Sequence, residues 1–236
     1  MRQATASWYR RQPVSQWPPW VGSLHQLTIP RGIVPHAQPA PVGGANINII
    51  LHLLGLTRDV PGDLAECGVF RGSTLVPVAL ELTQQKSAKH IYGFDSFEGF
   101  PDEVQYDMSL ESPPDSDKRM HGLDETSYEL VLRKIARFRL TNATLMKGYF
   151  NQTFPACEAR SFSFVHLDCD IYSSYKECLE FFYPRLSSGG IVLLDEYNDP
   201  PWPGCNQAVD EFLADKPERV REINRDNFLK YYFVKA

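Results

Sequence analysis

Acidic residues are missing from the start of this 236-residue chain, whose first carboxylate is Asp59. Residues 1–43 also hold seven of the 18 prolines and three of the four tryptophans, and they are basic through Arg2, Arg10, Arg11 and Arg31. Such proline spacing excludes a regular helix or a central strand. A disordered leader and an organelle transit peptide are both compatible with this composition. The tryptophans favour an arm that packs over the body or over a neighbouring subunit.

Three further absences exclude whole classes of protein. No apolar run reaches the 18 or more residues of a membrane span, and the N-terminus lacks the apolar core of a signal peptide. The five cysteines include no CxxC pair, which excludes the common zinc and disulfide frameworks and suits reduced thiols. A net charge of −5 argues against nucleic acid as a partner. We therefore expect a cytoplasmic protein that binds neither membranes nor nucleic acid.

The most informative stretch runs from residue 161 to residue 199 and predicts a strand, a helix and a second strand. Short apolar runs at 162–167 and 191–194 suit strands that are buried on both faces, as in a parallel sheet. Between them Leu179, Phe182, Tyr183 and Leu186 form one apolar stripe of a helix, and Ser188-Gly189-Gly190 is expected to end that helix.

Acidic residues follow both of these predicted strands. A strand–helix–strand unit crosses over right-handed, so both strands end at one edge of the sheet. Asp168 and Asp195 therefore lie on one rim, with Asp170 and Glu196 close by. One aspartate could cap a helix while the others are solvated. Four carboxylates at this spacing favour a hard-metal site, because they repel one another unless a cation or a proton lies among them.

The remaining patterns predict an α/β domain over residues 44–236. Helices are expected at 45–56, 75–82, 128–135 and 206–213, and strands at 63–70, 90–95 and 143–146. Two closing strands, near 220–223 and 229–234, are expected to form an antiparallel hairpin on an otherwise parallel sheet. The long polar segment 96–126 is interpreted as a mobile cover over the site, since structureless loops of this length are usually functional or disordered.

A glycine turn follows the first predicted strand. The pattern Glu66-x-Gly68-x-x-x-Gly72-Ser73-Thr74 runs from strand to helix, and Asp95 ends the next strand. Glycines let backbone N–H groups approach a ligand, a helix N-terminus favours anionic groups, and an acid at the end of the second strand can accept from ribose hydroxyls. The pattern differs from the GxGxxG fingerprint of dinucleotide enzymes. It indicates a nucleoside cofactor.

Several motifs in this order resemble the macrocin O-methyltransferase family. They are AECGVFRGST, GFDSFEGFPD, KGYFNQTFP, HLDCDIYSSYKECLEFFYPRLSSGG, LLDEY and GCNQAVDEF, and the resemblance covers about Pro61 to Phe212. Studied members of this family methylate sugar hydroxyls in antibiotic biosynthesis. The resemblance implies a class I methyltransferase fold: Rossmann-like α/β, with a mainly parallel seven-stranded sheet, helices on both faces and an antiparallel C-terminal strand.

The resemblance also implies S-adenosylmethionine and Mg²⁺ as cofactors, and it assigns residues to them. By similarity, the methionine part would be held by Glu66, Gly68, Arg71, Gly72, Ser73 and Thr74, the ribose by Asp95 and Ser96, and Gly148 and Tyr149 would lie near the adenine. The metal would be bound by Asp168, Asp195 and Glu196, and Asp170 would be the general base. Glu196 departs from the family pattern, which usually has a second aspartate there. We also expect a homo-oligomer, a dimer or a tetramer.

The reaction that the resemblance implies and the candidate site residues both favour methyl transfer to a hydroxylated small molecule, in particular a sugar. A sugar hydroxyl needs help to lose its proton, which a magnesium ion and a carboxylate base can supply. A nucleotide-sugar oxidoreductase or epimerase is one alternative, because Tyr172 and Lys176 have the Tyr-x-x-x-Lys spacing of such enzymes. A non-catalytic cofactor-binding subunit is another. We interpret His166 as a strand residue rather than a catalyst.

Overall fold

One seven-stranded sheet organises the chain. The computed structural model describes residues 42–100, 127–225 and 227–236, and the strands follow the order β3-β2-β1-β4-β5-β7-β6. The first five run parallel, and they are β1 (Asp63–Cys67), β2 (Ile91–Asp95), β3 (Ala143–Lys147), β4 (Phe162–Leu167) and β5 (Leu186–Leu194). The last two, β6 (Arg221–Arg225) and β7 (Phe228–Val234), form the antiparallel hairpin that the sequence predicts.

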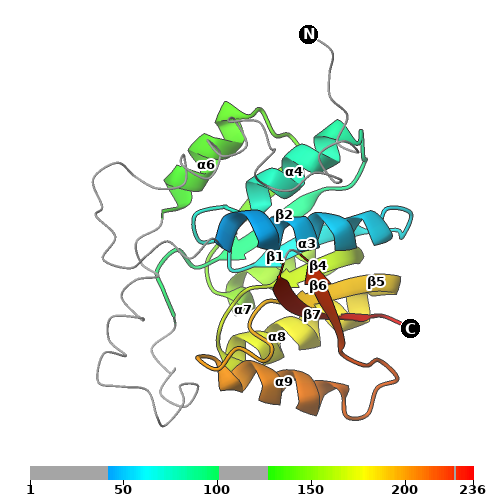
Figure 1. Cartoon of the computed structure of the whole chain (residues 1–236). Helices are drawn as coiled ribbons and strands as arrows, with labels where there is room; N and C mark the ends of the chain where they lie inside the picture. The colour runs from blue at the N-terminus through cyan, green and yellow to red at the C-terminus, as the bar shows by residue number, and fades with distance from the viewer. Residues whose placement is uncertain (1–41, 101–126, 226) are drawn as a thin grey trace.

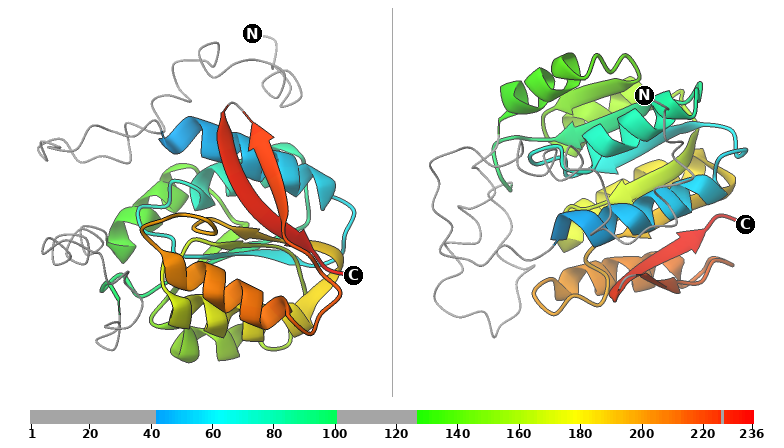
Figure 2. Two further views of the ribbon diagram at one scale, coloured as in Figure 1. Left: turned by 60° about the horizontal axis from the view of Figure 1, so that its bottom comes forward. Right: turned by 45° about the horizontal axis from the view of Figure 1, so that its top comes forward.

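Helices cover both faces of this sheet (Figures 1 and 2). One face carries α3 (Val42–Leu56), α4 (Leu75–Gln84) and α6 (Tyr128–Arg137). The other carries α7 (Phe150–Thr153), the 3₁₀ turn η3 (Phe154–Cys157), α8 (Tyr172–Phe182) and α9 (Pro203–Leu213). Two apolar cores result, one on each side of the parallel strands. The predicted fold class is confirmed.

Two buried polar residues, Glu66 on β1 and His166 on β4, lie on the same face of the sheet. On β1, Leu64 packs into the core under α3 and α4, whereas Ala65 and Cys67 pack into the core on the opposite face. Successive side chains of a strand point to opposite faces, so Glu66 lies on the same side as Leu64. Its neighbour in the register of β4 is His166. The two buried polar groups therefore lie side by side on the face that α3 covers.

The predicted turn at Ser188-Gly189-Gly190 is wrong. The helix ends at Phe182, a 3₁₀ turn η4 (Tyr183–Arg185) follows, and these residues lie inside β5, which starts at Leu186. Pro184 is the physical reason, because its ring nitrogen has no hydrogen to donate to the preceding helical turn. Gly189 and Gly190 instead exchange backbone hydrogen bonds with Lys235. Tyr183 and Leu186 consequently belong to the turn and the strand, not to the helix.

The other element boundaries shift by a few residues. α9 begins at Pro203 rather than at Asn206, because proline is well tolerated in the first helical position. All five cysteines are free and buried, as expected of reduced thiols. None of the described helices combines the length and the apolar character that a membrane-spanning helix requires. The arm expected over residues 1–43 and the cover expected over 96–126 lie mostly outside the described residues.

Candidate functional site

A cavity of about 1160 Å³ opens at the carboxyl ends of the central parallel strands. This is the edge at which open α/β sheets bind their ligands. Most of the residues that were assigned to the cofactor line it, namely Glu66, Gly68, Ser73, Asp95, Ser96, Gly148 and Tyr149. Asp168 and Asp170 line it as well. Arg71, Gly72, Thr74, Asp195 and Glu196 are not among the lining residues.

Close contact between β1 and β4 shapes the floor of the cavity. Gly68 has a φ of +91°, and a Cβ atom there would lie 1.7 Å from the carbonyl oxygen of Asp168. The backbone N–H of Asp168 donates to the carbonyl of Cys67 at 2.9 Å, which extends the strand pairing to this point. Only glycine fits such an approach and such a φ. The spacing of Gly68 in the sequence signalled this turn correctly.

Asp95 organises the turn that follows. One carboxylate oxygen accepts from the backbone N–H of Phe70 and the other from that of Phe97, both at 2.7 Å. The backbone at Arg71 and Gly72 lies against α6. The carbonyl oxygen of Arg71 accepts from Nζ of Lys134 at 2.5 Å, and a Cβ atom on Gly72 would lie 2.9 Å from the side chain of Val131. α6 therefore supports this turn from behind.

Glu66 is a buried carboxylate with an unsatisfied oxygen. The residue is 2% exposed, and Oε2 has no hydrogen-bond partner among the described residues. Burial raises the pKa of Glu66 to about 7, and the nearby His166 opposes that shift only in part. A buried carboxylate that lines a cavity without a full set of donors is suited to a cationic group of a ligand.

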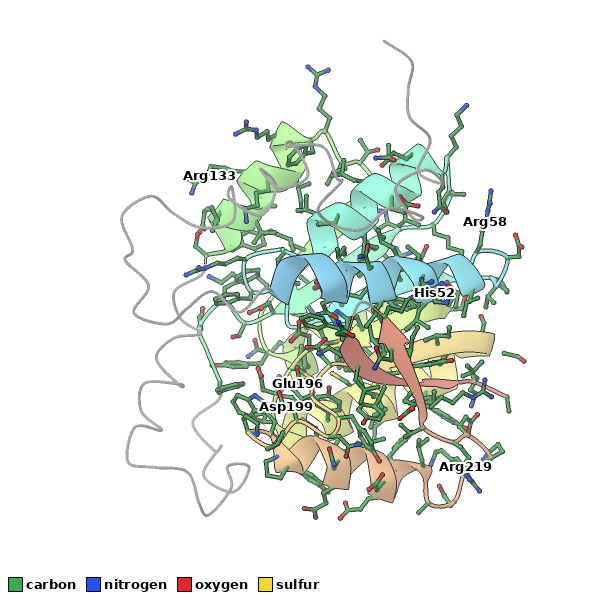
Figure 3. All side chains as sticks on the ribbon, in the orientation of Figure 1. His52, Arg58, Arg133, Glu196, Asp199 and Arg219 are labelled. Carbon is green, nitrogen blue, oxygen red and sulfur yellow. The ribbon has the colours of Figure 1, made fainter. Side chains whose placement is uncertain are left out.

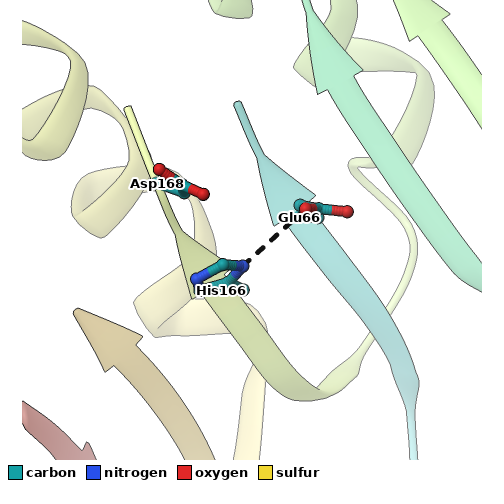
Figure 4. A group of neighbouring side chains, drawn as sticks. All are labelled: Glu66, His166 and Asp168. Atoms are coloured by element: carbon teal, nitrogen blue, oxygen red, sulfur yellow. Dashed lines mark ion pairs between the residues drawn. The ribbon is translucent and has the colours of Figure 1, made fainter. Parts of the chain in front are cut away.

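His166 on β4 faces Glu66 on β1, and Asp168 follows the same strand as His166 (Figure 4). Nδ1 is 3.8 Å from Oε1 of Glu66, and Nε2 is 3.3 Å from Oδ1 of Asp195. Burial lowers the pKa of His166, but its contacts with Asp195 and Glu66 outweigh burial and raise the pKa to about 10. The histidine is a strand residue, as predicted. No pattern in the sequence indicates that His166 connects two acids of the site.

The acidic rim brings three predicted metal ligands together. Asp168, Asp195 and Glu196 each offer one carboxylate oxygen, and these oxygens all lie within 4.8 Å of one another. Glu196 follows β5 and lies beside Asp199 in the loop after that strand (Figure 3). Burial and the charge of Asp195 raise the pKa of Asp168 to about 6. Burial and the charges of Asp168 and Asp195 raise the pKa of Glu196 well above its usual range.

Asp195 differs from its neighbours because cationic and amide donors surround it. Nζ of Lys230 lies 2.7 Å from Oδ2 and 2.8 Å from the backbone oxygen, and Nδ2 of Asn46 donates to Oδ1 at 3.2 Å. Burial favours the neutral acid, but the bond to His166 and the charge of Lys230 hold the pKa of Asp195 well below its usual range. Sequence reasoning missed Lys230 and Asn46. Each is distant from Asp195 along the chain.

Glu196 and Asp170 are fixed by a third group of contacts. The hydroxyl of Tyr175 lies 2.6 Å from Oε2 of Glu196, and the backbone N–H of Asp170 donates to the same oxygen at 3.4 Å. Asp170 has a φ of +62°, so the chain turns sharply after β4. Burial and the charge of Asp168 raise the pKa of Asp170 to about 8. Asp170 is thus a cavity-lining carboxyl group with a strong affinity for a proton.

The sequence pattern of one family matches most of the chain. Residues 51–231 match the family described as macrocin-O-methyltransferase (TylF). A Streptomyces olivaceus protein named 8-demethyl-8-(2,3-dimethoxy-alpha-L-rhamnosyl)-tetracenomycin-C 4'-O-methyltransferase is 33% identical over 163 residues, which cover 66% of this chain and 60% of that protein. Mycinamicin III 3''-O-methyltransferase of Micromonospora griseorubida is 29% identical over 181 residues, which cover 72% of this chain and 68% of that protein.

Solved structures of methyltransferases share the fold of this chain. The O-methyltransferase NovP superposes with a TM-score of 0.66 at 26% sequence identity, covering 81% of this chain and 79% of that structure. The Podospora anserina methyltransferase PaMTH1, solved with SAH bound, superposes with a TM-score of 0.60 at 16% identity, covering 98% of this chain and 93% of that structure. The fold is that of class I methyltransferases. Because residues 51–231 match the sequence pattern of the macrocin O-methyltransferase family, the chain belongs to that family.

Proposed function

We propose that this protein transfers a methyl group from S-adenosylmethionine to a hydroxyl of a sugar or sugar-bearing natural product, with Mg²⁺ bound at the acidic rim. The observation that carries the proposal is one cavity that joins the unsatisfied carboxylate of Glu66 to Asp168 and Asp170. A cationic cofactor and a proton acceptor would then share one cavity. The named relatives methylate sugar-bearing antibiotics or their precursors.

The residues of the cavity fit the cofactor. Glu66 would accept from the amino group of its methionine part, which supplies the donor that Oε2 lacks. Asp95 would accept from the ribose hydroxyls, since each carboxylate oxygen has a second lone pair beyond the one that the backbone N–H groups use. Gly148 and Tyr149 line the cavity beyond β3 and would border the adenine.

The acidic rim fits a hard cation. Its three clustered carboxylates are all-oxygen donors, as Mg²⁺ prefers. Burial and mutual repulsion raise the pKa values of Asp168 and Glu196, which favours a proton or a cation between them. When bound there, Mg²⁺ would lower the pKa of an acceptor hydroxyl and orient it. Asp168, Asp195 and Glu196 would hold it, while Lys230 and Asn46 fix the orientation of Asp195.

Asp170 would act as the general base. When S-adenosylmethionine gives up its methyl group to the acceptor oxygen and keeps the electron pair of the broken carbon–sulfur bond, the hydroxyl proton would pass to a carboxylate oxygen of Asp170. Burial and the charge of Asp168 raise the pKa of Asp170 to about 8 when no cation balances the acidic rim. A cation held by Asp168 would lower that pKa, so that Asp170 is ionised and can accept the proton. Its position in the cavity wall leaves the carboxyl group open to an acceptor.

Cofactor binding tests the proposal directly. We expect calorimetry to show binding of S-adenosylmethionine and of SAH without any acceptor, and Glu66→Gln to weaken that binding by about 10- to 100-fold, because a hydrogen bond to a charged group is lost. Glu81→Gln is a matched control, since Glu81 is also buried but packs on α4 outside the cavity. Tighter binding of NAD(P) than of S-adenosylmethionine would contradict the proposal and support an oxidoreductase.

Methyl transfer itself distinguishes an enzyme from a non-catalytic subunit. Radiolabel from S-adenosylmethionine should pass to a sugar-bearing acceptor when Mg²⁺ is present. Cofactor binding without transfer to any glycosylated acceptor would indicate a protein that kept the fold and lost the reaction.

A further inference from the structure

The cavity has a second wall to which no role has yet been assigned. Its volume of about 1160 Å³ exceeds the roughly 300–1,000 Å³ of ordinary small-molecule sites, which leaves room for a second molecule beside a cofactor. The residues assigned to the cofactor lie at the ends of β1, β2 and β3. Other lining residues belong to the N-terminal halves of α8 and α9, namely Tyr172, Ser173, Ser174, Pro203, Gly204 and Gln207. We call this surface the α8–α9 wall.

Glu211 fixes the orientation of two side chains of the α8–α9 wall. The hydroxyl of Tyr172 donates to Oε2 of Glu211 at 2.7 Å, and Nε2 of Gln207 donates to Oε1 at 2.8 Å. These bonds, first from Gln207 and then from Tyr172, hold the pKa of Glu211 below its usual value. An amide that has donated one N–H keeps an oxygen acceptor and a second N–H. Gln207 therefore lines the cavity with hydrogen-bonding capacity in a defined orientation.

The α8–α9 wall is also attached to the proposed base. Sγ of Cys205, in the first turn of α9, donates to the carbonyl oxygen of Asp170 at 2.8 Å. The loop before α9 is held by two bonds between Asn198 and Asn206, at 2.7 and 2.8 Å. A molecule that binds this wall would consequently be held at a fixed position relative to Asp170.

We propose that Gln207, oriented by Glu211, binds a hydroxyl of the acceptor's sugar ring and thereby determines which hydroxyl faces Asp170. This inference rests on the proposed methyltransferase function. The chemistry of the wall supports it, because three residues with hydroxyl groups, Tyr172, Ser173 and Ser174, line the same cavity as Gln207. A surface of hydroxyl and amide groups matches a polyhydroxylated ring. It discriminates against analogues that lack a hydroxyl, since the polar group of the protein would then stay unpaired.

A matched pair of glutamines provides the test. Gln207 and Gln152 both line the cavity, but Gln152 lies on α7 beside Gly148, on the side assigned to the cofactor. The probe is methyl α-L-rhamnopyranoside, titrated into SAH-loaded protein in the presence of Mg²⁺ and followed by ligand-observed NMR. Gln207→Ala should weaken rhamnoside binding by about 3- to 10-fold, as expected for one lost hydrogen bond, and leave the SAH affinity unchanged.

Two further variants serve as a control, Gln152→Ala, and as a test of the orienting contact, Glu211→Leu. Gln152→Ala should leave rhamnoside binding unchanged. Glu211→Leu should reproduce the loss seen with Gln207→Ala, because Gln207 then lacks its orienting partner. An unchanged rhamnoside affinity in Gln207→Ala, or an equal loss in Gln152→Ala, would overturn the inference. Failure of the SAH-loaded wild type to bind the rhamnoside would overturn it too, without touching the proposed function, which fails only if SAH itself does not bind or no methyl group is transferred.

Discussion

Two carboxylates separated by one residue, Asp168 and Asp170, have different surroundings at the end of β4. Asp168 keeps the strand pairing through its backbone N–H and contributes an oxygen to the cluster with Asp195 and Glu196. Asp170 follows a sharp turn and offers its backbone N–H to Glu196, while its carboxyl group lines the cavity. The first is therefore suited to a metal and the second to a proton.

Asparagine substitutions should separate these two roles. We expect Asp170→Asn to reduce turnover by about 10²- to 10⁴-fold, the usual contribution of a general base, and to leave Mn²⁺ affinity nearly unchanged. Asp168→Asn should weaken Mn²⁺ binding itself, because it removes a charged oxygen ligand. Electron paramagnetic resonance titrations of Mn²⁺ on both variants provide the measurement. If Asp170→Asn loses as much metal affinity as Asp168→Asn, Asp170 is a ligand and the base lies elsewhere.

At the scale of elements, the turn between β1 and α4 depends on a contact that only glycine permits. Gly68→Ala would place a methyl group 1.7 Å from the carbonyl oxygen of Asp168 and require a left-handed backbone. Strain and overpacking together should lower the free energy of unfolding by about 3 kcal/mol or more. Gly99→Ala is the matched control, because Gly99 also has a positive φ, +82°, but apart from its two chain neighbours no atom of the described residues lies within 4 Å of an added Cβ.

Urea denaturation of the two alanine variants measures the difference. The control should lose only about 1–2 kcal/mol, the cost of the left-handed backbone alone. Equal losses in both variants would show that the β1–β4 contact at Gly68 adds nothing beyond backbone strain.

α6 supports the same turn through a buried lysine. Lys134 donates to the carbonyl oxygen of Arg71, and burial, with a smaller effect of the Arg71 charge, lowers the pKa of Lys134 from 10.5 to about 8. The unfolded chain therefore binds more protons than the folded chain between pH 8 and 10.5. The contribution of Lys134 to stability should rise with pH across that window.

The difference between wild type and Lys134→Met isolates this contribution from other titrating groups. Urea unfolding at pH 7.5 and at pH 10 should show that the wild type gains stability relative to the variant as the pH rises. A constant difference between the two proteins across this range would contradict the lowered pKa of Lys134.

At the scale of the whole molecule, the metal should act as a stabilising ligand. The clustered acids of the rim follow two neighbouring strands, and the raised pKa values of Asp168 and Glu196 reflect burial and, after it, mutual repulsion within the folded state. A cation that binds only the folded chain stabilises it by about 2.7 kcal/mol at 100 times its dissociation constant. For a domain of this size, that free energy corresponds to roughly 5–10 °C in melting temperature.

Thermal unfolding with Mg²⁺, and with Na⁺ at equal ionic strength, tests this expectation. Mg²⁺ should raise the melting temperature of the wild type, chelation should reverse the increase, and Asp168→Asn should abolish it. An equal increase in Asp168→Asn would place the stabilising ion somewhere other than the rim.

Local patterns in the sequence predicted most of the fold. The apolar runs of β4 and β5, the stripe of α3 and the glycine turn at Gly68 depend on near neighbours and on backbone geometry, which the sequence displays directly. The prediction of a turn at Ser188–Gly190 was wrong, because it assumed that the glycines end the helix. Pro184 ends the helix earlier. Gly189 then pairs with Lys235 from the far end of the chain, a contact without any local signature.

For the site, the sequence by itself determined which carboxylates meet. Parallel strands that are joined by a right-handed crossover end at one edge, so Asp168 and Asp195 had to lie near each other. Only the tertiary structure decided how those acids are held. Lys230 and Asn46 reach Asp195 from a C-terminal hairpin and an N-terminal helix, and His166 joins Asp195 to Glu66 across strands. Contacts between distant segments depend on how the elements pack, and no periodicity or spacing along the chain records that packing.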